Sequence, residues 1–341
     1  MNDIQKKILN IIQTQFPIDP RPYARVSEGL HSSEAIVLDE VGKMKQAGII
    51  RRIGANFNPA ALGYISTLAG ASVPCNLLDE FVAEVNGLAG VSHNYGRRHR
   101  VNVWFTLTMK QQESIERTID DLRRKYSLPF LHSFPAEEIF KLQVNFDFSG
   151  NRQEVSRHPT GDSRQYTNPH NFSEANVLAE PSGRDGLFSR QIALVRRLQE
   201  DLPVVSESFN DMSERIAIPV TSILQQIREW KATGLIRRFG ASIHHRQAGF
   251  TCNAMVVLAV EAQQIEPAGR FLSGFRQVSH CYQRRTIPEW PFQLYAMAHC
   301  HSKAELDKLI QQMVEEIHPL RHDVLLSVSE YKKNNIKYFT E

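Results

Sequence analysis

The feature that most restricts the possible folds is an internal repeat that runs through most of the chain. Residues 234–250 read GLIRRFGASIHHRQAGF, and residues 48–64 read GIIRRIGANFNPAALGY. Two further pairs follow in the same order: GVSHNYGRR (90–98) with QVSHCYQRR (277–285), and NVWFTLTM (102–109) with QLYAMAHC (293–300). A repeat of this length indicates two related structural units, so the fold must be one that a duplication can build.

The two copies differ most at a pair of histidines. His244 and His245 in the second copy correspond to Asn58 and Pro59 in the first. A chain that repeats its scaffold but changes its chemistry in one copy suggests one working site and one supporting copy.

Each repeat begins with a helical pattern. Apolar residues recur at helical spacing in residues 4–13, 33–46 and 218–233. Prolines at 17, 20 and 22 end the first helix, and Gly48 and Gly234 end the other two. Two or three helices followed by a short strand pair are typical of a winged helix-turn-helix.

The remainder of each repeat predicts the order βαββαβ, which is a ferredoxin-like plan. In the first repeat the expected strands are 64–73, 91–95, 102–108 and 139–148, and the expected helices are 77–85 and 114–125. In the second repeat the strands are 251–260, 278–282, 292–298 and 324–329, and the helices are 265–272 and 303–316.

We therefore predict an α+β protein, a tandem duplication of a winged helix-turn-helix and a ferredoxin-like domain. The two winged units are assigned to residues 1–60 and 187–246, and the two ferredoxin-like domains to 61–148 and 247–341. Residues 149–186 are poor in aliphatic side chains and rich in Ser, Asn, Arg, Pro and Gly, which predicts a polar linker. We expect the two halves to pack as an internal pseudo-dimer that is open to further self-association.

Composition narrows the functional classes. The net charge of +3 over 341 residues gives no strong bias toward nucleic acid. No apolar run reaches the roughly 18 residues that a membrane span needs. The first residues, MNDIQKKILNIIQ, have the pattern of an amphipathic helix and not of a signal peptide. The four cysteines show no pairing pattern, so we predict a cytoplasmic protein with reduced thiols.

The predicted architecture and the local motifs point to a known family. A winged helix-turn-helix joined to a ferredoxin-like domain resembles the Lrp/AsnC regulators. The segments RRFGASIHHRQAGF, TCNAMVVLAV, VSHCYQRR and WPFQLYAM resemble, more narrowly, the siroheme decarboxylases of haem d1 biosynthesis, in a form with two subunit types fused into one chain.

This resemblance implies an activity. The expected reaction is loss of CO2 from the C12 and C18 acetates of siroheme, which gives 12,18-didecarboxysiroheme. Siroheme is then the substrate, and no separate cofactor is expected. A macrocycle edged with carboxylates needs apolar walls and a cationic rim, and arginine suits the rim because its fork can hold a carboxylate by two hydrogen bonds.

The resemblance also implies site residues. Histidine is the natural proton donor near neutral pH and the usual ligand of haem iron. His245, His280 and His93 are the candidate catalytic residues, with His245 or His280 as the group nearest the siroheme iron. The candidate substrate-binding residues are Arg97, Arg98, Arg246, Arg284, Arg285, Tyr95, Tyr282, His244, Trp290 and Tyr295, and Arg100 is a further candidate for the cationic rim.

Other interpretations remain open from sequence. The Arg51–Arg52 and Arg237–Arg238 pairs could contact phosphate in a DNA-binding regulator, but neither expected recognition helix is basic, so DNA binding is not expected. A carrier of haem or siroheme without turnover is a third hypothesis. His299 and His301 alternate on one strand, yet no fourth ligand is near in sequence, so a structural metal is not expected.

Overall fold

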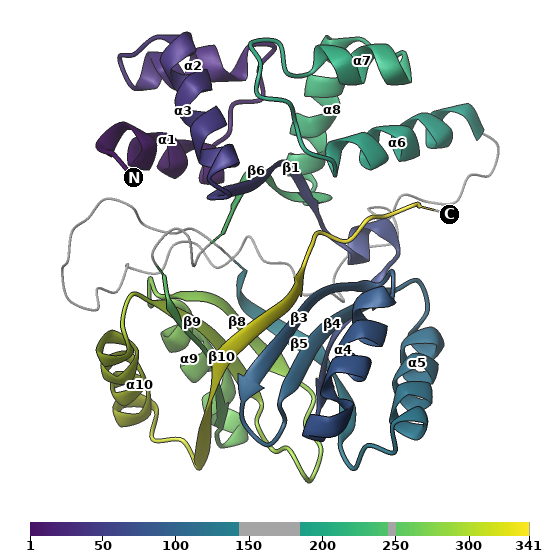
Figure 1. Cartoon of the computed structure of the whole chain (residues 1–341), viewed down its shortest axis with the longest axis vertical. Coiled ribbons are helices and arrows are strands. Elements are labelled where there is room, and N and C mark those ends of the chain that lie inside the picture. Colours follow the sequence, from purple (N-terminus) through teal and green to yellow (C-terminus); the bar gives the residue numbers. More distant parts are fainter. Residues whose placement is uncertain (143–184, 245–249, 341) are drawn as a thin grey trace.

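The computed structural model arranges the chain in two layers, a helical layer above a barrel of strands (Figure 1). The structure describes residues 1–142, 185–244 and 250–340, and for residues 185–188 only the backbone. Most of the predicted linker at 149–186 lies outside the described residues, and so do His245 and Arg246.

Each repeat contributes a helix-turn-helix unit to the helical layer. The first repeat supplies α1 (Asp3–Thr14), α2 (Pro22–Gly29) and α3 (Glu34–Gln46), and the second supplies α6 (Asp185–Leu198), α7 (Asn210–Ile216) and α8 (Val220–Ala232). Local residues set where these helices begin. Asn2 and Gln5 form a capping box at α1, and the Ser33 hydroxyl caps α3. Pro22 is the first residue of α2, where its missing N–H costs nothing.

The strand after each helical unit pairs with its counterpart in the other repeat. β1 (Ile50–Phe57) and β6 (Ile236–Ile243) run antiparallel, with Gly54 opposite Gly240. The prediction of a strand pair inside each winged unit is therefore wrong. Among the described residues, each unit supplies one strand, and the pair joins the two units.

Two glycines make this arrangement possible. A Cβ on Gly240 would lie 2.4 Å from the carbonyl oxygen of Ile12 in α1, and a Cβ on Gly54 would lie 2.6 Å from that of Glu200, just after α6. Only glycine permits so close an approach. Each strand therefore rests on the carboxyl end of the first helix of the other repeat.

Two arginines hold the same contact. The Arg238 guanidinium donates to the Gln13 carbonyl oxygen at 3.2 Å, and the Arg52 guanidinium donates to the Gln199 carbonyl oxygen at 2.7 Å. These carbonyls lie at helix ends, where they have no partner within the helix and attract positive charge. The repeated arginine thus explains why the strands pair between units.

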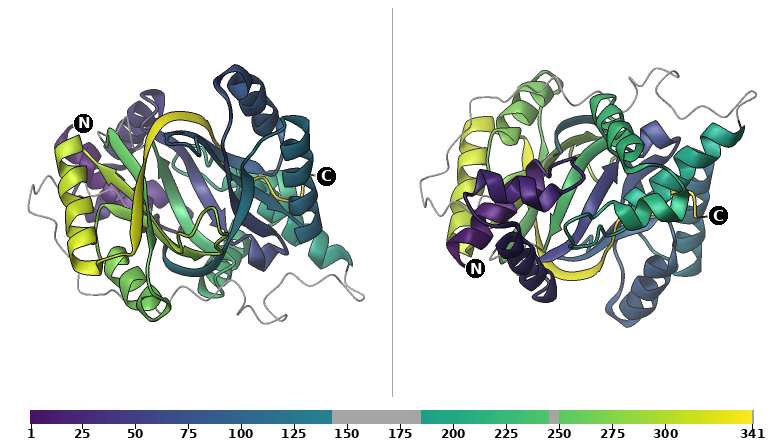
Figure 2. Two further views of the ribbon diagram at one scale, coloured as in Figure 1. Left: turned by 90° about the horizontal axis from the view of Figure 1, so that it is seen from below. Right: turned by 90° about the horizontal axis from the view of Figure 1, so that it is seen from above.

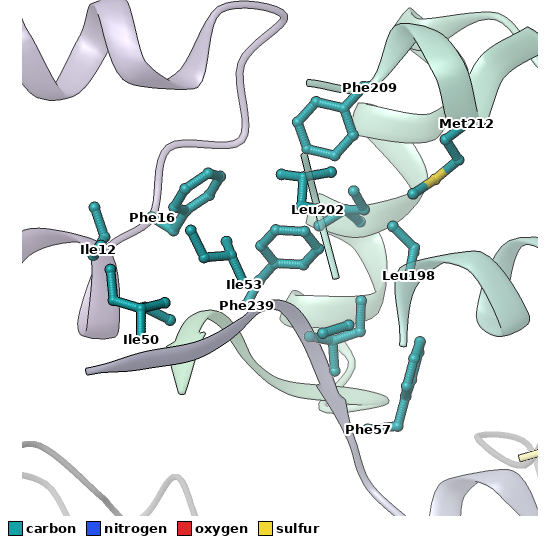
Figure 3. Packing of buried hydrophobic residues seen from close by; sticks show 14 of the residues in the cluster. Ile12, Phe16, Ile50, Ile53, Phe57, Leu198, Leu202, Phe209, Met212 and Phe239 are labelled. Carbon is teal, nitrogen blue, oxygen red and sulfur yellow. The ribbon is translucent and has the colours of Figure 1, made fainter. Parts of the chain in front are cut away.

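The helical layer has one core to which both repeats contribute. Figure 3 shows Phe16 and Ile53 of the first repeat close to Phe239 of the second. The rings of Phe16 and Phe239 lie 5.8 Å apart between centroids. Since the apolar faces of both units meet in this core, neither unit buries its own face alone.

Strands of both repeats form one closed barrel (Figure 2). Around the barrel the order is β10, β3, β4, β2, β5, β8, β9, β7. The bounds are β2 (Ile65–Ala71), β3 (Val91–Arg98), β4 (Val103–Met109), β5 (Leu131–Leu142), β7 (Cys252–Ala259), β8 (Val278–Arg284), β9 (Leu294–Cys300) and β10 (Arg321–Lys333). Each repeat supplies four neighbouring strands in the order expected for a ferredoxin-like sheet.

The last strand of each repeat joins the two sheets. The first part of β5 pairs with β2 and its second part pairs with β8, while β10 pairs first with β7 and then with β3. The predicted strand at 139–148 is wrong at its start, since β5 begins at Leu131. Pro135 and two glutamates interrupt its alternation at the point where it changes partner, so the pattern was hidden. The predicted strand at 324–329 is likewise too short at both ends.

Helices cover the outside of the barrel. α4 (Leu78–Gly87) and α5 (Gln112–Lys125) pack on the first sheet, and α9 (Ile265–Ser273) and α10 (Lys303–Ile317) pack on the second. An aromatic cluster fills part of the interior, with Trp104 and Trp290 at its centre. In the described part of the chain, no helix is long and apolar enough to span a membrane.

Candidate functional site

A bulge in β3 turns two neighbouring side chains into the barrel. Val91 packs against the outer helices and Asn94 bonds to α4, while the register with β4 shifts between these two residues. Ser92 and His93 therefore both face the interior, where Ser92 Oγ lies 2.7 Å from Thr106 Oγ1.

The same bulge recurs in β8. Val278 and Cys281 belong to the outer core, and the register with β9 shifts just after Val278. Ser279 and His280 therefore face the interior, and Ser279 Oγ lies 2.8 Å from His299 Nε2. The repeated motif VSH thus places one serine–histidine pair on each side of the interior.

Alternate residues of β3 continue this face as a first column, which consists of His93, Tyr95 and Arg97. The rings of His93 and Tyr95 lie 6.2 Å apart at 30°, and Arg97 Cζ lies 5.2 Å from the Tyr95 ring centroid. Arg97 Nη2 reaches across to Met297 Sδ of the second repeat at 3.7 Å. The first column therefore faces residues of the other half.

A second column on β8 consists of His280, Tyr282 and Arg284. The rings of His280 and Tyr282 lie 6.2 Å apart at 16°, and Arg284 Cζ lies 4.5 Å from the Tyr282 centroid and 5.6 Å from that of Tyr295. The two columns have the same residues in the same order, because both descend from one repeat.

Arg284 carries an uncompensated charge. Its side chain is 9 % exposed, and Nη1 donates to the Phe134 carbonyl oxygen at 2.8 Å. Within the described residues it makes no ion pair, and its Nε has no hydrogen-bond partner. Burial lowers its pKa below the usual value. A buried guanidinium that contacts aromatic rings and only one carbonyl acceptor is suited to bind an anionic ligand.

The two column histidines are held neutral. Burial, and then the positive charge of Lys333, lowers the pKa of both His93 and His280 to about 3. His280 and Arg51 lower the pKa of His93 further, and Arg284 is the next contributor at His280. Both imidazoles therefore lie in one cationic environment, which anionic groups of a ligand would neutralise.

Lys333 and Arg51 form a cationic edge where the helical layer meets the barrel. Lys333 lies opposite His93 in the pairing of β10 with β3. Arg51 donates to the Lys333 carbonyl oxygen at 3.0 Å and forms an ion pair with Glu330. This contact ties β1 of the helical layer to β10 of the barrel, directly beside the first column.

Trp290 and Tyr295 lie in the aromatic filling of the barrel. Both are almost fully buried, and Trp290 Nε1 donates to the Tyr295 hydroxyl at 2.9 Å. Tyr295 also contacts Arg284, so it supports the second column. Trp290 packs on Trp104 in the aromatic cluster, with 5.4 Å between ring centroids.

Three of the predicted arginines lie away from the columns. Arg98 and Arg285 are exposed, and Arg98 follows Arg97 on a strand, so its side chain leaves on the opposite face. Arg100 donates to the Glu289 carbonyl oxygen at 2.9 Å and lies over the Trp290 ring. The structure therefore brings together one arginine from each predicted Arg–Arg pair, and not both.

The histidine pair that distinguishes the repeats is described only in part. The His244 backbone N–H donates to the Ile49 carbonyl oxygen at 2.8 Å, next to β1. Burial, and then Arg51, lowers the pKa of the His244 side chain. His244 therefore lies near the same cationic edge, while His245 and Arg246 are outside the described residues.

The structure adds site residues that the sequence reasoning missed. Ser92 and Ser279 hold Nδ1 of the column histidines at 2.8 Å in both repeats. The recurrence of serine directly before histidine in both VSH motifs could have indicated them. His299 bonds to Ser279 and Asn253, while His301 stacks on Phe250. Among the described residues, no group of His, Cys, Asp or Glu is arranged to hold a metal.

Comparison with known proteins relates this site to a family. Residues 61–141 and 247–332 match the AsnC-like ligand binding domain, and residues 5–51 match the siroheme decarboxylase NirDL-like HTH domain. The chain is similar to the siroheme decarboxylase of Hydrogenobacter thermophilus, with 31% identity over 98% of this chain and 95% of the relative.

Two further similarities are to a separate subunit, which matches part of the chain, and to a solved structure. The siroheme decarboxylase alpha subunit of Oleidesulfovibrio alaskensis is 48% identical over 43% of this chain and 88% of its own length. A crystal structure of the siroheme decarboxylase NirDL in complex with an iron-uroporphyrin III analogue has a TM-score of 0.68 at 26% identity, and covers 98% of this chain and 94% of that chain.

Proposed function

The chain belongs to the siroheme decarboxylase family, and from that premise we propose that it removes CO2 from the C12 and C18 acetates of siroheme to give 12,18-didecarboxysiroheme. The observation that carries the proposal is the pair of His–Tyr–Arg columns inside one barrel. Siroheme is the substrate, and the proposal needs no separate cofactor. We place the reaction in the cytoplasm.

The arginines and aromatic rings account for binding. Arg284 is buried without a counter-charge, so a substrate carboxylate would supply the anion that it lacks. Arg97 lies at the matching position of the first column. Tyr95 and Tyr282 offer flat faces to a macrocycle and hydroxyl groups to its carboxylates.

The histidines account for the chemistry. When an acetate loses CO2, its C–C bond breaks and the electron pair stays on the methylene carbon, where the conjugated macrocycle can spread it. A proton then forms the new C–H bond of the methyl group. Carboxylates of the bound substrate would offset the cationic environment that keeps both histidines neutral, so that His93 or His280 can take up a proton and deliver it to the methylene carbon. The histidine then regains a proton from water, so each step consumes one proton and releases one CO2.

The remaining predicted residues complete the proposal. His245 and Arg246 follow His244 next to the cationic edge, and we propose that they act on the substrate from that side. Tyr295 supports Arg284. Since the related alpha subunit matches less than half of this chain, we propose that the two repeats correspond to two subunits of an internal pseudo-dimer.

Anaerobic incubation of the purified protein with siroheme tests the proposal. The expected result is a product series in which each step lowers the mass by one CO2. Tight binding of siroheme with no mass loss over hours would favour a carrier and would exclude the enzyme. A change at a propionate instead of an acetate, read by NMR of the product, would exclude the proposed positions.

A further inference from the structure

A chain of hydrogen bonds within the second repeat ends at His280. Asn253 Oδ1 lies 2.6 Å from His299 Nδ1, His299 Nε2 lies 2.8 Å from Ser279 Oγ, and Ser279 Oγ lies 2.8 Å from His280 Nδ1. Asn253, Ser279 and His299 are each at most 9 % exposed. No step proposed above uses Asn253 or His299.

The direction of each hydrogen bond follows from its starting point. Asn253 Nδ2 donates to the Phe250 carbonyl oxygen at 3.2 Å, so the amide oxygen is the atom that faces His299. An amide oxygen can only accept, so the proton of a neutral His299 lies on Nδ1. His299 Nε2 must then accept, and its donor is the Ser279 hydroxyl.

The same logic continues to the second column. The Met297 carbonyl oxygen also lies 3.3 Å from Ser279 Oγ, but His299 Nε2 is the closer acceptor at 2.8 Å and takes the hydroxyl proton. The Ser279 oxygen then accepts from His280, so the proton of His280 lies on Nδ1. A neutral imidazole has one proton, so Nε2 of His280 carries a lone pair. His280 lies on the face of β8 that is turned to the barrel interior.

The first repeat has no such chain. Ser92 Oγ lies 2.8 Å from His93 Nδ1 and 2.7 Å from Thr106 Oγ1, and each hydroxyl can donate or accept. The position that matches His299 is Thr108, whose hydroxyl pairs with Ser66 at 2.8 Å. Nothing in this pair of hydroxyls dictates which nitrogen of His93 carries the proton.

We propose that Asn253, His299 and Ser279 act as positioning residues that hold His280 with its proton on Nδ1. The lone pair on Nε2 of His280 is then available to the substrate as an electron-pair donor, and His93 is the proton donor. The division of roles rests on the proposed function, but the tautomer of His280 does not. The structure thus separates two histidines that occupy equivalent places in the repeat.

Nitrogen-15 NMR of the full chain without substrate tests the tautomer directly, because protonated and unprotonated ring nitrogens have well-separated shifts. For the wild type we expect His280 with a protonated Nδ1 and an unprotonated Nε2. Asn253→Leu and Ser279→Ala break the chain at two points, and each should give His280 a mixture of tautomers.

Thr106→Val is the matched control in the first repeat, since it should change the signals of His93 and leave those of His280 as they are. In the siroheme assay, Asn253→Leu should lower kcat about tenfold with KM within about twofold. A wild-type His280 protonated on Nε2, or one unaffected by both chain-breaking changes, would overturn the proposal. A wild type that does not turn over siroheme but shows the expected tautomer would refute the function and leave the tautomer assignment standing.

Discussion

Arginines of the repeated Arg–Arg motifs have opposite environments in the helical layer and in the barrel. In the helical layer, Arg52 donates to the carbonyls of Gln199 and Ala55 and to the Asn56 side chain, at 2.7 to 2.9 Å. In the barrel, Arg284 has one carbonyl acceptor and two aromatic rings. Both are substantially buried, and burial lowers the pKa of Arg52 to about 10.

This difference separates structural from functional charge. Arg52 and Arg238 lie at helix ends, whose carbonyls satisfy a cation permanently. Arg284 has no comparable acceptors, so its charge is uncompensated until an anion enters. The same residue type therefore stabilises one layer and prepares the other for a ligand, and the following changes test that contrast.

The largest expected effect is on catalysis. His280→Ala and His93→Ala should each lower the rate of CO2 release roughly a hundredfold, because each removes a proposed proton-transfer or electron-pair group. His322→Ala, at an exposed position of β10, is the control and should keep the wild-type rate. Anaerobic product analysis measures the rates, and circular dichroism checks folding. A folded variant with full rate would remove that histidine from the mechanism.

A paired change tests the two arginine environments. Arg284→Met should weaken binding of the iron tetrapyrrole about tenfold or more, while the free energy of unfolding stays within about 1 kcal/mol of wild type, since a buried unpaired cation is lost. Arg52→Met should lower the free energy of unfolding by about 2–3 kcal/mol, because charged hydrogen bonds to helix-end carbonyls are lost.

Urea unfolding and spectroscopic titration with an iron porphyrin measure the two quantities. Strong destabilisation by Arg284→Met would mean that Arg284 is a structural residue like Arg52. Full stability of Arg52→Met would mean that the helix-end contacts do not hold the layer together.

A smaller effect is expected from pH. The pKa of His93 and of His280 is lowered to about 3 in the folded chain from an ordinary value of 6.5. Below about pH 6.5 the unfolded chain therefore takes up protons that the folded chain refuses, so the free energy of unfolding should fall as pH drops from 7.5 toward 4.5. The double variant His93→Gln/His280→Gln should show a shallower fall in urea titrations. Parallel curves for the two proteins would contradict the assignment.

The smallest expected effect is on DNA binding. All four arginines beside the helical units have internal contacts: Arg51 with β10, Arg237 with the Asn58 side chain at 2.8 Å, and Arg52 and Arg238 with helix ends. We therefore expect no salt-dependent binding of duplex DNA. Fluorescence anisotropy at low salt measures it, and binding that weakens steeply with added salt would restore the regulator hypothesis.

The sequence predicted the repeating scaffold better than the contacts between repeats. The VSH and RR motifs indicated the strands that carry both histidine columns, because strand alternation and the duplication can be recognised from the sequence alone. The pairing of β1 with β6 and the crossing of β5 from β2 to β8 were not predictable, since both depend on where the other repeat lies in space. The role of His299 was not predictable either, because its hydrogen bonds to Ser279 and Asn253 join three separate strands.

The crossing strands also determine when the protein can fold. Until β8 and β10 have been synthesised, the first sheet has two unpaired edges, at β3 and at β5. Unpaired edges invite association with other chains, and contacts between distant residues form slowly. Synthesis must therefore reach the end of β10, at residue 333, before the barrel can close. Two separate half-length chains would associate through these same edges. In the fused chain both sheets belong to one polypeptide, so each edge is present at a high local concentration near its partner.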